Sequence, residues 1–254
     1  LTTDWNNSDY YIGVVKAGIL ARNSEVVFVD ISHSIEHYNW QQAAFVLRSV
    51  VDDFPEGTIH IIGVGSEPDE DQKIVVAVYK KQYFICTDNG TLGIVFKEKP
   101  EKVFALDLGF GNFCFIEKNV FVPLANRIIS GRDLQDIEGI EIKADVLRYT
   151  ESLPVVSERN IVGSIVYIDS YGNAITNISR ELFADVVGDR CFEILLNSAK
   201  HKTSQIFDSY KEVAASEIVC LFNSLELLEV AVCCGSAKHL LGLRYDSKIR
   251  IDIK

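Results

Sequence analysis

The chain begins with Leu1-Thr-Thr-Asp-Trp-Asn-Asn-Ser-Asp-Tyr-Tyr-Ile-Gly-Val-Val-Lys-Ala-Gly-Ile-Leu20, which predicts the end of a strand, a polar turn and a helix. The apolar residues from Tyr11 to Ile19 recur at helical spacing, so the helix would lie against a sheet. Asp4 and Asp9 therefore fall where a strand's carboxyl end meets a helix's amino end, the crevice in which open α/β sheets bind ligands. A carboxylate offers only acceptors and could bind both hydroxyls of a ribose. The alternative is that Asp9 merely caps the helix and Asp4 the turn.

The residues that follow continue an alternation of strands and helices. Val26–Ile31 is a continuous apolar run and predicts a strand covered on both faces. Asn39 is placed to cap a helix that runs through Asp53. Further strands are predicted at 58–64, 73–78, 83–86 and 103–108, and a short helix at 120–129. This part of the chain predicts an α/β domain with a largely parallel or mixed sheet.

The pattern changes after about residue 145. Short strands with alternating or β-branched residues are predicted at 163–168, 174–178, 192–196, 218–222, 227–233 and 248–253. Such a series favours a small antiparallel barrel or sandwich. We therefore predict two domains, an α/β domain at 1–150 and a smaller all-β, barrel-like domain at 155–254, with a boundary near Leu153-Pro154.

Composition excludes several classes of partner. A net charge of -11 argues against nucleic acid, because binding phosphates needs clustered Lys and Arg. No apolar run reaches transmembrane length and no stretch resembles a signal peptide, so we expect no membrane partner. The six cysteines form no CxxC pair and several lie in apolar runs, which predicts buried free thiols in a reducing compartment, the cytoplasm.

Metal and cofactor signatures are weak. His33 follows Asp30 by three residues, but one His and one Asp do not make a metal site, and a structural His is favoured. The acidic loop Glu67-Pro-Asp-Glu-Asp71 lacks the ligand spacing of a calcium loop and is better explained as a solvated surface. The chain contains no Ser–His–Asp signature, no P-loop and no G-x-G-x-x-G after a strand. We expect no metal and no cofactor.

Six blocks of sequence follow one another in a specific order. They are Thr3-Asp-Trp-Asn-Asn-Ser-Asp-Tyr-Tyr-Ile-Gly-Val-Val-Lys, Val29-Asp-Ile-Ser-His-Ser-Ile, Ala43-Ala-Phe-Val-Leu, Phe54-Pro-Glu-Gly-Thr-Ile-His, Thr87-Asp-Asn-Gly-Thr-Leu and Ile168-Asp-Ser-Tyr-Gly-Asn-Ala-Ile-Thr-Asn-Ile. In their order and spacing, nearly end to end, the chain resembles the S-adenosylmethionine hydroxide adenosyltransferases. These enzymes convert S-adenosylmethionine and water to adenosine and methionine, and they are related to fluorinating and chlorinating enzymes.

The resemblance implies an α/β domain followed by a β-barrel, and a homotrimer that holds a small nucleoside ligand between one subunit's first domain and its neighbour's second. It also implies roles for particular residues. The matching positions are Asp4 for the ribose hydroxyls, Asp9 for the methionine portion, Tyr38 for stacking near the sugar, Asp169, Tyr171 and Asn173 for the adenine end, and Ser224 for the amino-acid end. Stacking suits a flat base, and an amide pairs with adenine's donor and acceptor. For Tyr171 and Asn173 the alternative is a Gly-containing hairpin turn.

The departures from the family are equally specific. Where family hydrolases have an Asp, an Arg and a His that position and polarise a water, an ungapped alignment places Gly65, Gln72 and Ile116. These side chains offer little acid–base help. An Arg that would hold the methionine carboxylate is replaced by Leu225. The acids available as substitutes are Glu67, Asp69 and Glu117.

Three hypotheses result. The first is a nucleoside-binding family member, a pseudoenzyme candidate whose hydrolysis of S-adenosylmethionine is weak or lost. The second is an active hydrolase that uses the nearby acids in place of the missing residues. The third is a non-catalytic trimeric interaction protein. Release of adenosine from S-adenosylmethionine would favour the second, binding without turnover the first, and neither the third.

Overall fold

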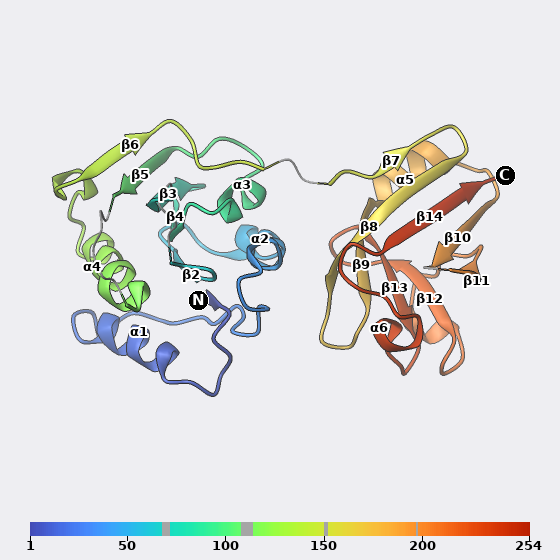
Figure 1. The fold of residues 1–254 in the computed structure, drawn as a ribbon, viewed down its shortest axis with the longest axis horizontal. Coiled ribbons are helices and arrows are strands. Elements are labelled where there is room, and N and C mark those ends of the chain that lie inside the picture. The colour runs from blue at the N-terminus through green and yellow to red at the C-terminus, as the bar shows by residue number, and fades with distance from the viewer. Residues whose placement is uncertain (68–71, 108–113, 150–151, 197) are drawn as a thin grey trace. The chain divides into compact units, whose positions relative to one another are not determined.

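The computed structural model describes residues 1–67, 72–107, 114–149, 152–196 and 198–254 (Figure 1). The chain divides into two compact units, Leu1–Thr150 and Glu151–Lys254. The first contains a mixed sheet with helices and the second an antiparallel sheet that curls into a nearly closed barrel. The predicted fold class is therefore confirmed for both parts of the chain.

The sheet of the first unit has six strands in the order β1-β2-β4-β3-β5-β6. Their bounds are β1 Thr2–Thr3, β2 Ile59–Gly63, β3 Ile74–Tyr79, β4 Gln82–Thr87, β5 Lys102–Leu106 and β6 Ile140–Lys143. β2 pairs in parallel with both β1 and β4, whereas β3 is antiparallel to β4 and β5, and β6 is antiparallel to β5. The carboxyl ends of β1, β2 and β4 therefore meet at one edge of the sheet.

Helices cover both faces of this sheet. Their bounds are α1 Tyr11–Leu20, α2 Trp40–Arg48, α3 Thr91–Val95 and α4 Val122–Ile129. Along β3, Val75 packs into one apolar cluster with α2 and α3, and Val76 packs into another with α1 and α4. This alternation is what a strand covered on both faces requires, because successive side chains point to opposite sides.

Two predictions about this unit are wrong in detail. Val26–Ile31 forms no strand: the chain there makes separate backbone hydrogen bonds to Leu1, and Val27 is 85% exposed. An apolar run does not by itself show whether a neighbouring strand pairs with it. Asn39 does cap α2, accepting a 2.9 Å hydrogen bond from the Gln42 amide. That helix ends at Arg48, however, and Val51–Asp53 is a separate 3-10 turn.

A π-helical turn, Glu117–Phe121, precedes α4 and gives Glu117 its position. The Val122 amide donates to the Glu117 carbonyl, five residues back. The next residue, Pro123, has no amide hydrogen and cannot make the bond that an α-helical register would require. Such π-turns are rare and occur frequently at functional sites.

The second unit is an antiparallel sheet in the order β11-β10-β14-β8-β9-β13-β12, with β7 paired to β8 off this path. The strands are β7 Val155–Val156, β8 Asn160–Ile168, β9 Ala174–Ser179, β10 Phe192–Leu196, β11 Ser198–Thr203, β12 Ile218–Phe222, β13 Leu227–Val232 and β14 Lys248–Ile253. Their inward-facing apolar residues form one core with helices α5, Arg180–Val187, and α6, Ala237–Leu240. Among all the residues described, no helix combines the length and apolarity needed to cross a membrane.

Candidate functional site

Asp4 lies at the edge of the sheet where the parallel strands end. Thr3 pairs with Gly63, the last residue of β2, and the Asp4 amide donates to the Gly63 carbonyl at 3.3 Å. The Asp4 side chain is buried, with 7% of the residue exposed, and its Oδ2 accepts the Tyr38 amide at 2.9 Å. No other described residue donates to this carboxylate, which has further acceptor positions.

Tyr38 and Asp9, two more predicted site residues, are exposed. Tyr38 has a φ of 63°, its backbone amide donates to Asp4, and 79% of the residue is exposed. Asp9 does not cap α1: the capping position is Tyr10, and that helix has no side-chain cap. The capping alternative for Asp9 is therefore wrong, and its carboxylate is exposed.

Glu117 is the candidate acid that the structure buries, with 5% of the residue exposed. A Cβ added to Gly63 would lie 3.2 Å from Glu117 Oε1 and 2.7 Å from the Trp5 ring, so the acid sits directly over the end of β2. Burial raises the pKa of Glu117, the Ser66 hydroxyl opposes this, and the charges of Asp4 and Glu67 raise the pKa further. Glu67 itself is exposed, and Asp69 lies outside the described residues.

The three replaced positions differ in their surroundings. Ile116 is 1% exposed and packs in the apolar core with α1 and α4. Gly65 has a φ of 53°, and a Cβ there would lie 3.8 Å from the Tyr38 Cα, so this glycine lies beside the Asp4–Tyr38 contact. Gln72 is partly buried at the start of a described segment. None of the three side chains can exchange a proton at neutral pH.

The Thr87-Asp-Asn-Gly turn contributes to this edge, which sequence reasoning did not foresee. Asn89 is 9% exposed and donates to the Val64 carbonyl at 3.3 Å. Its Oδ1 accepts the Thr91 hydroxyl at 2.7 Å, and the Thr87 hydroxyl donates to the Ser66 carbonyl. The turn residues thus fix the loop that carries Gly65 and Ser66. The signal for this role was a polar turn directly after an apolar strand.

His33 has a structural role, as predicted. Its Nδ1 is 2.8 Å from the Thr3 hydroxyl and its Nε2 is 3.1 Å from Asp30 Oδ1, which joins β1 to the 30–33 segment. Burial lowers the pKa of His33 more than the Asp30 carboxylate raises it. Within the described ranges no group of three His, Cys, Asp or Glu side chains is arranged to hold a metal ion.

In the second unit, Asp169, Tyr171 and Asn173 form the turn between β8 and β9. Asp169 Oδ1 accepts the Tyr171 and Asn173 amides at 2.9 and 2.8 Å, and its Oδ2 accepts the Asn173 side-chain nitrogen at 3.1 Å. Gly172, with a φ of 83°, allows the turn, and Tyr171 projects with 78% of the residue exposed. The hairpin-turn alternative is thus correct as a description of the backbone, and it leaves the Tyr171 ring available for stacking.

Ser224 lies exposed in the β12–β13 turn, beside a partly buried polar network that the sequence did not reveal. Asn223 Oδ1 accepts the Leu225 amide at 2.9 Å, and Asn223 Nδ2 donates to Glu229 Oε2 at 3.1 Å. Glu229 is 3% exposed and also accepts the Tyr210 hydroxyl at 2.6 Å. This network fixes the turn that carries Ser224 and the partly buried Leu225.

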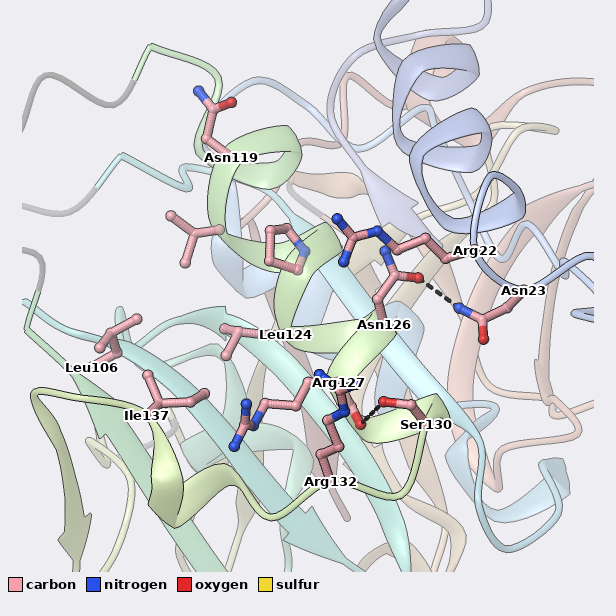
Figure 2. A pocket seen from close by; sticks show the side chains of 12 residues that line it. Arg22, Asn23, Leu106, Asn119, Leu124, Asn126, Arg127, Ser130, Arg132 and Ile137 are labelled. Atoms are coloured by element: carbon pink, nitrogen blue, oxygen red, sulfur yellow. Dashed lines mark hydrogen bonds between the residues drawn. The ribbon is translucent and has the colours of Figure 1, made fainter.

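A separate cavity of about 540 Å³ lies between the end of α1, α4 and the segment after it (Figure 2). It is lined by Arg22, Arg127 and Arg132 together with apolar and amide side chains, and Asn23 donates to Asn126 at 2.8 Å within it. None of the predicted site residues lines this cavity, so it is distinct from the edge that carries Asp4.

Comparison with known proteins gives the same family for both units. Residues 1–138 match the S-adenosylmethionine hydroxide adenosyltransferase N-terminal domain, and residues 163–250 match the C-terminal domain of that family. The chain is 27% identical to the (R)-S-adenosyl-L-methionine hydrolase of Methanocaldococcus jannaschii, an alignment that covers 99% of this chain and 94% of the relative. It is 26% identical to the Thermus thermophilus enzyme of that name, over 98% of this chain and 97% of the relative.

Solved structures agree. An uncharacterized conserved protein from Thermotoga maritima superposes with a TM-score of 0.83 at 27% identity, covering 99% of this chain and 98% of that one. A conserved hypothetical protein from Thermus thermophilus shares the fold, with a TM-score of 0.76 at 23% identity over 100% of this chain and 97% of its own. With family models matching most of its length, the chain belongs to the S-adenosylmethionine hydroxide adenosyltransferase family.

Proposed function

We propose that this chain binds S-adenosylmethionine or adenosine, with Asp4 accepting the ribose hydroxyls. The observation that carries the proposal is the Asp4 carboxylate, buried at the carboxyl edge of β1 and β2 with acceptor positions left after its contact with the Tyr38 amide. A desolvated carboxylate bound to a diol gives charge-assisted hydrogen bonds, which are stronger than neutral ones. Tyr38, held in place by that contact, is the proposed stacking partner near the sugar.

The second unit is proposed to supply the remaining contacts. Tyr171 would stack on adenine, Asn173 would read its edge, and Ser224 would bind the amino-acid end, as the family resemblance implies. Supporting this, the turns that carry these residues are fixed internally by Asp169 and Asn223. Because the proposed residues fall in both units, we also propose the homotrimer that the resemblance implies. The cytoplasm remains the proposed compartment: among the described residues, which include all six cysteines, no disulfide forms.

The proposed reaction is hydrolysis to adenosine and methionine, at a rate well below that of relatives with the Asp, Arg and His. Two relatives carry the name hydrolase, which supports the reaction type. Gly65, Gln72 and the core residue Ile116 provide no proton acceptor at the three positions. Leu225 offers no charge to a carboxylate, so the amino-acid end would be oriented less firmly.

Two measurements on the purified full chain test this function. Calorimetry with adenosine tests binding, and incubation with S-adenosylmethionine followed by chromatography for adenosine and methionine tests turnover. We expect saturable adenosine binding and slow release of both products. Absence of both binding and turnover would refute the proposal and leave the interaction-protein hypothesis.

A further inference from the structure

The end of β2 carries a buried acid that the family's usual water-activating residues do not explain. Glu117 stands on the π-turn before α4, and its Oε1 would be 3.2 Å from a Cβ on Gly63. Gly63 is in turn the pairing partner of Thr3 and the acceptor of the Asp4 amide. The absence of a side chain at Gly63 is what leaves room for the carboxyl group beside the proposed ribose site.

Two other carboxylates act on Glu117. Asp4 comes from the end of β1 and Glu67 from the loop after β2, and both carboxylates act on Glu117. No Lys, Arg or His within the described part of the chain forms an ion pair with it. Burial and these charges raise the pKa of Glu117, which brings the carboxyl group closer to the range where a general base works at neutral pH.

Ser66 gives a second indication. Its hydroxyl is buried, with 8% of the residue exposed, and lies beside the Glu117 carboxyl group, where it acts to lower the pKa of Glu117; the contact does not reach the geometry of a full hydrogen bond, and no described residue offers the hydroxyl a better one. Buried hydroxyl groups nearly always have a partner, in the protein or in bound water. A water held between Ser66 and Glu117 would satisfy both groups.

We propose, resting on the proposed function above, that Glu117 is the catalytic base of this chain and that Ser66 positions the attacking water against it. The water oxygen forms a bond to C5′ of S-adenosylmethionine while the C5′–sulfur bond breaks. The electron pair of the breaking bond stays on the sulfur and neutralises the sulfonium charge. Methionine leaves as a thioether, Glu117 takes the proton that the water loses, and that proton then passes to solvent. Asp4, across Gly63, holds the ribose to which C5′ belongs.

The main test replaces Glu117 by an isosteric amide. Glu117→Gln should lower kcat/KM for S-adenosylmethionine on the order of 10²–10⁴-fold while adenosine affinity by calorimetry stays within about twofold. The acidic limb of the wild-type pH–rate profile, which reports ionisation of the base, should disappear. Glu138→Gln, the same change at an exposed acid, serves as the matched control and should leave both the rate and the profile unchanged.

Two variants of residues beside Glu117 test its role as the base, through the direction in which the acidic limb of the pH–rate profile moves. Glu67→Gln removes a charge that raises the pKa of Glu117 and should move the acidic limb to lower pH. Ser66→Ala removes a group that favours the ionised form, so it should move the limb to higher pH and also reduce turnover without weakening adenosine binding. If either residue had a merely structural role, its variant would leave the acidic limb of the pH–rate profile at the wild-type position.

The outcomes are distinguishable. Full turnover and an unchanged profile in Glu117→Gln overturn this inference. A wild-type chain that binds adenosine but releases none from S-adenosylmethionine also overturns it, while leaving the binding part of the proposed function intact. If Glu117→Gln fails to fold, a wild-type profile without an acidic limb above the usual glutamate range overturns it instead.

Discussion

Replacing Asp4 provides the sharpest test of nucleoside binding, because this carboxylate has two separable tasks. One is the hydrogen bond from the Tyr38 amide, at 2.9 Å and partly buried. The other is the proposed contact with the ribose diol. Asp4→Ala removes both acceptors, whereas Asp4→Asn keeps an amide oxygen for the Tyr38 amide but loses the charge and turns one acceptor into a donor.

The magnitudes follow from these contacts. A hydrogen bond to a charged group is worth roughly 1.5–3 kcal/mol, so either variant should weaken adenosine binding about tenfold or more. Asp4→Ala also leaves the Tyr38 amide without its acceptor, which should lower the free energy of unfolding by about 1–3 kcal/mol. Asp4→Asn should cost much less stability, because the Tyr38 amide keeps a partner.

Calorimetry with adenosine and urea unfolding, applied to both variants, separate the two effects. We expect both to bind weakly but Asp4→Ala alone to be clearly destabilised. Wild-type affinity in Asp4→Asn, with the fold intact, would refute the ribose role. A loss of affinity seen solely in Asp4→Ala would instead mean that Asp4 acts by holding the loop of Tyr38.

Three further predictions concern packing, pH and assembly. Gly63→Ala should lower the free energy of unfolding by about 1–3 kcal/mol, because the added Cβ would lie 2.7 Å from the Trp5 ring. Gly13→Ala, in α1 where nothing lies within 4 Å of the added Cβ, should raise the free energy of unfolding by roughly 0.5–1 kcal/mol. Equal effects of the two variants in urea unfolding would contradict this prediction. Burial lowers the pKa of His60, so protonation of His60 favours the unfolded chain and stability is lost as the pH falls below 6.5. Between pH 7 and pH 5, His60→Gln should therefore lose less of its free energy of unfolding than the wild type does. Light scattering should give a mass three times that of the 28.4 kDa chain, and a monomer at micromolar concentration would exclude the trimer.

The second unit shows how much a local pattern can specify. The strands predicted there all form, with ends that differ from the predicted ones by a few residues at most. Alternation of apolar side chains and the turn residues between strands act over a few positions, so the sequence states them directly. The polar network of Tyr210, Glu229 and Asn223 was not predicted, because its members come from separate parts of the chain.

The first unit shows the limit of such patterns. Val26–Ile31 has the composition of a buried strand, yet the segment forms no strand and Val27 is 85% exposed. Asp9 stands where a cap is expected, yet the helix begins after Tyr10 and has no side-chain cap. In both cases the local signal was present, but the contacts that usually accompany it did not form.

The sequence by itself determined most of the strands, the family resemblance and the position of Asp4 after a strand, because periodicity and turn chemistry depend on residues close in the chain. Tertiary structure alone decided which acid is buried. In sequence Glu117 is the better placed of the two candidates, one residue beyond the position of the family's His, but its direction is open; folding exposes Glu67 and places Glu117 over Gly63, near Asp4 and Ser66. The pKa of a carboxyl group depends on desolvation and on charges a few ångströms away, and those neighbours come from segments that are distant in sequence.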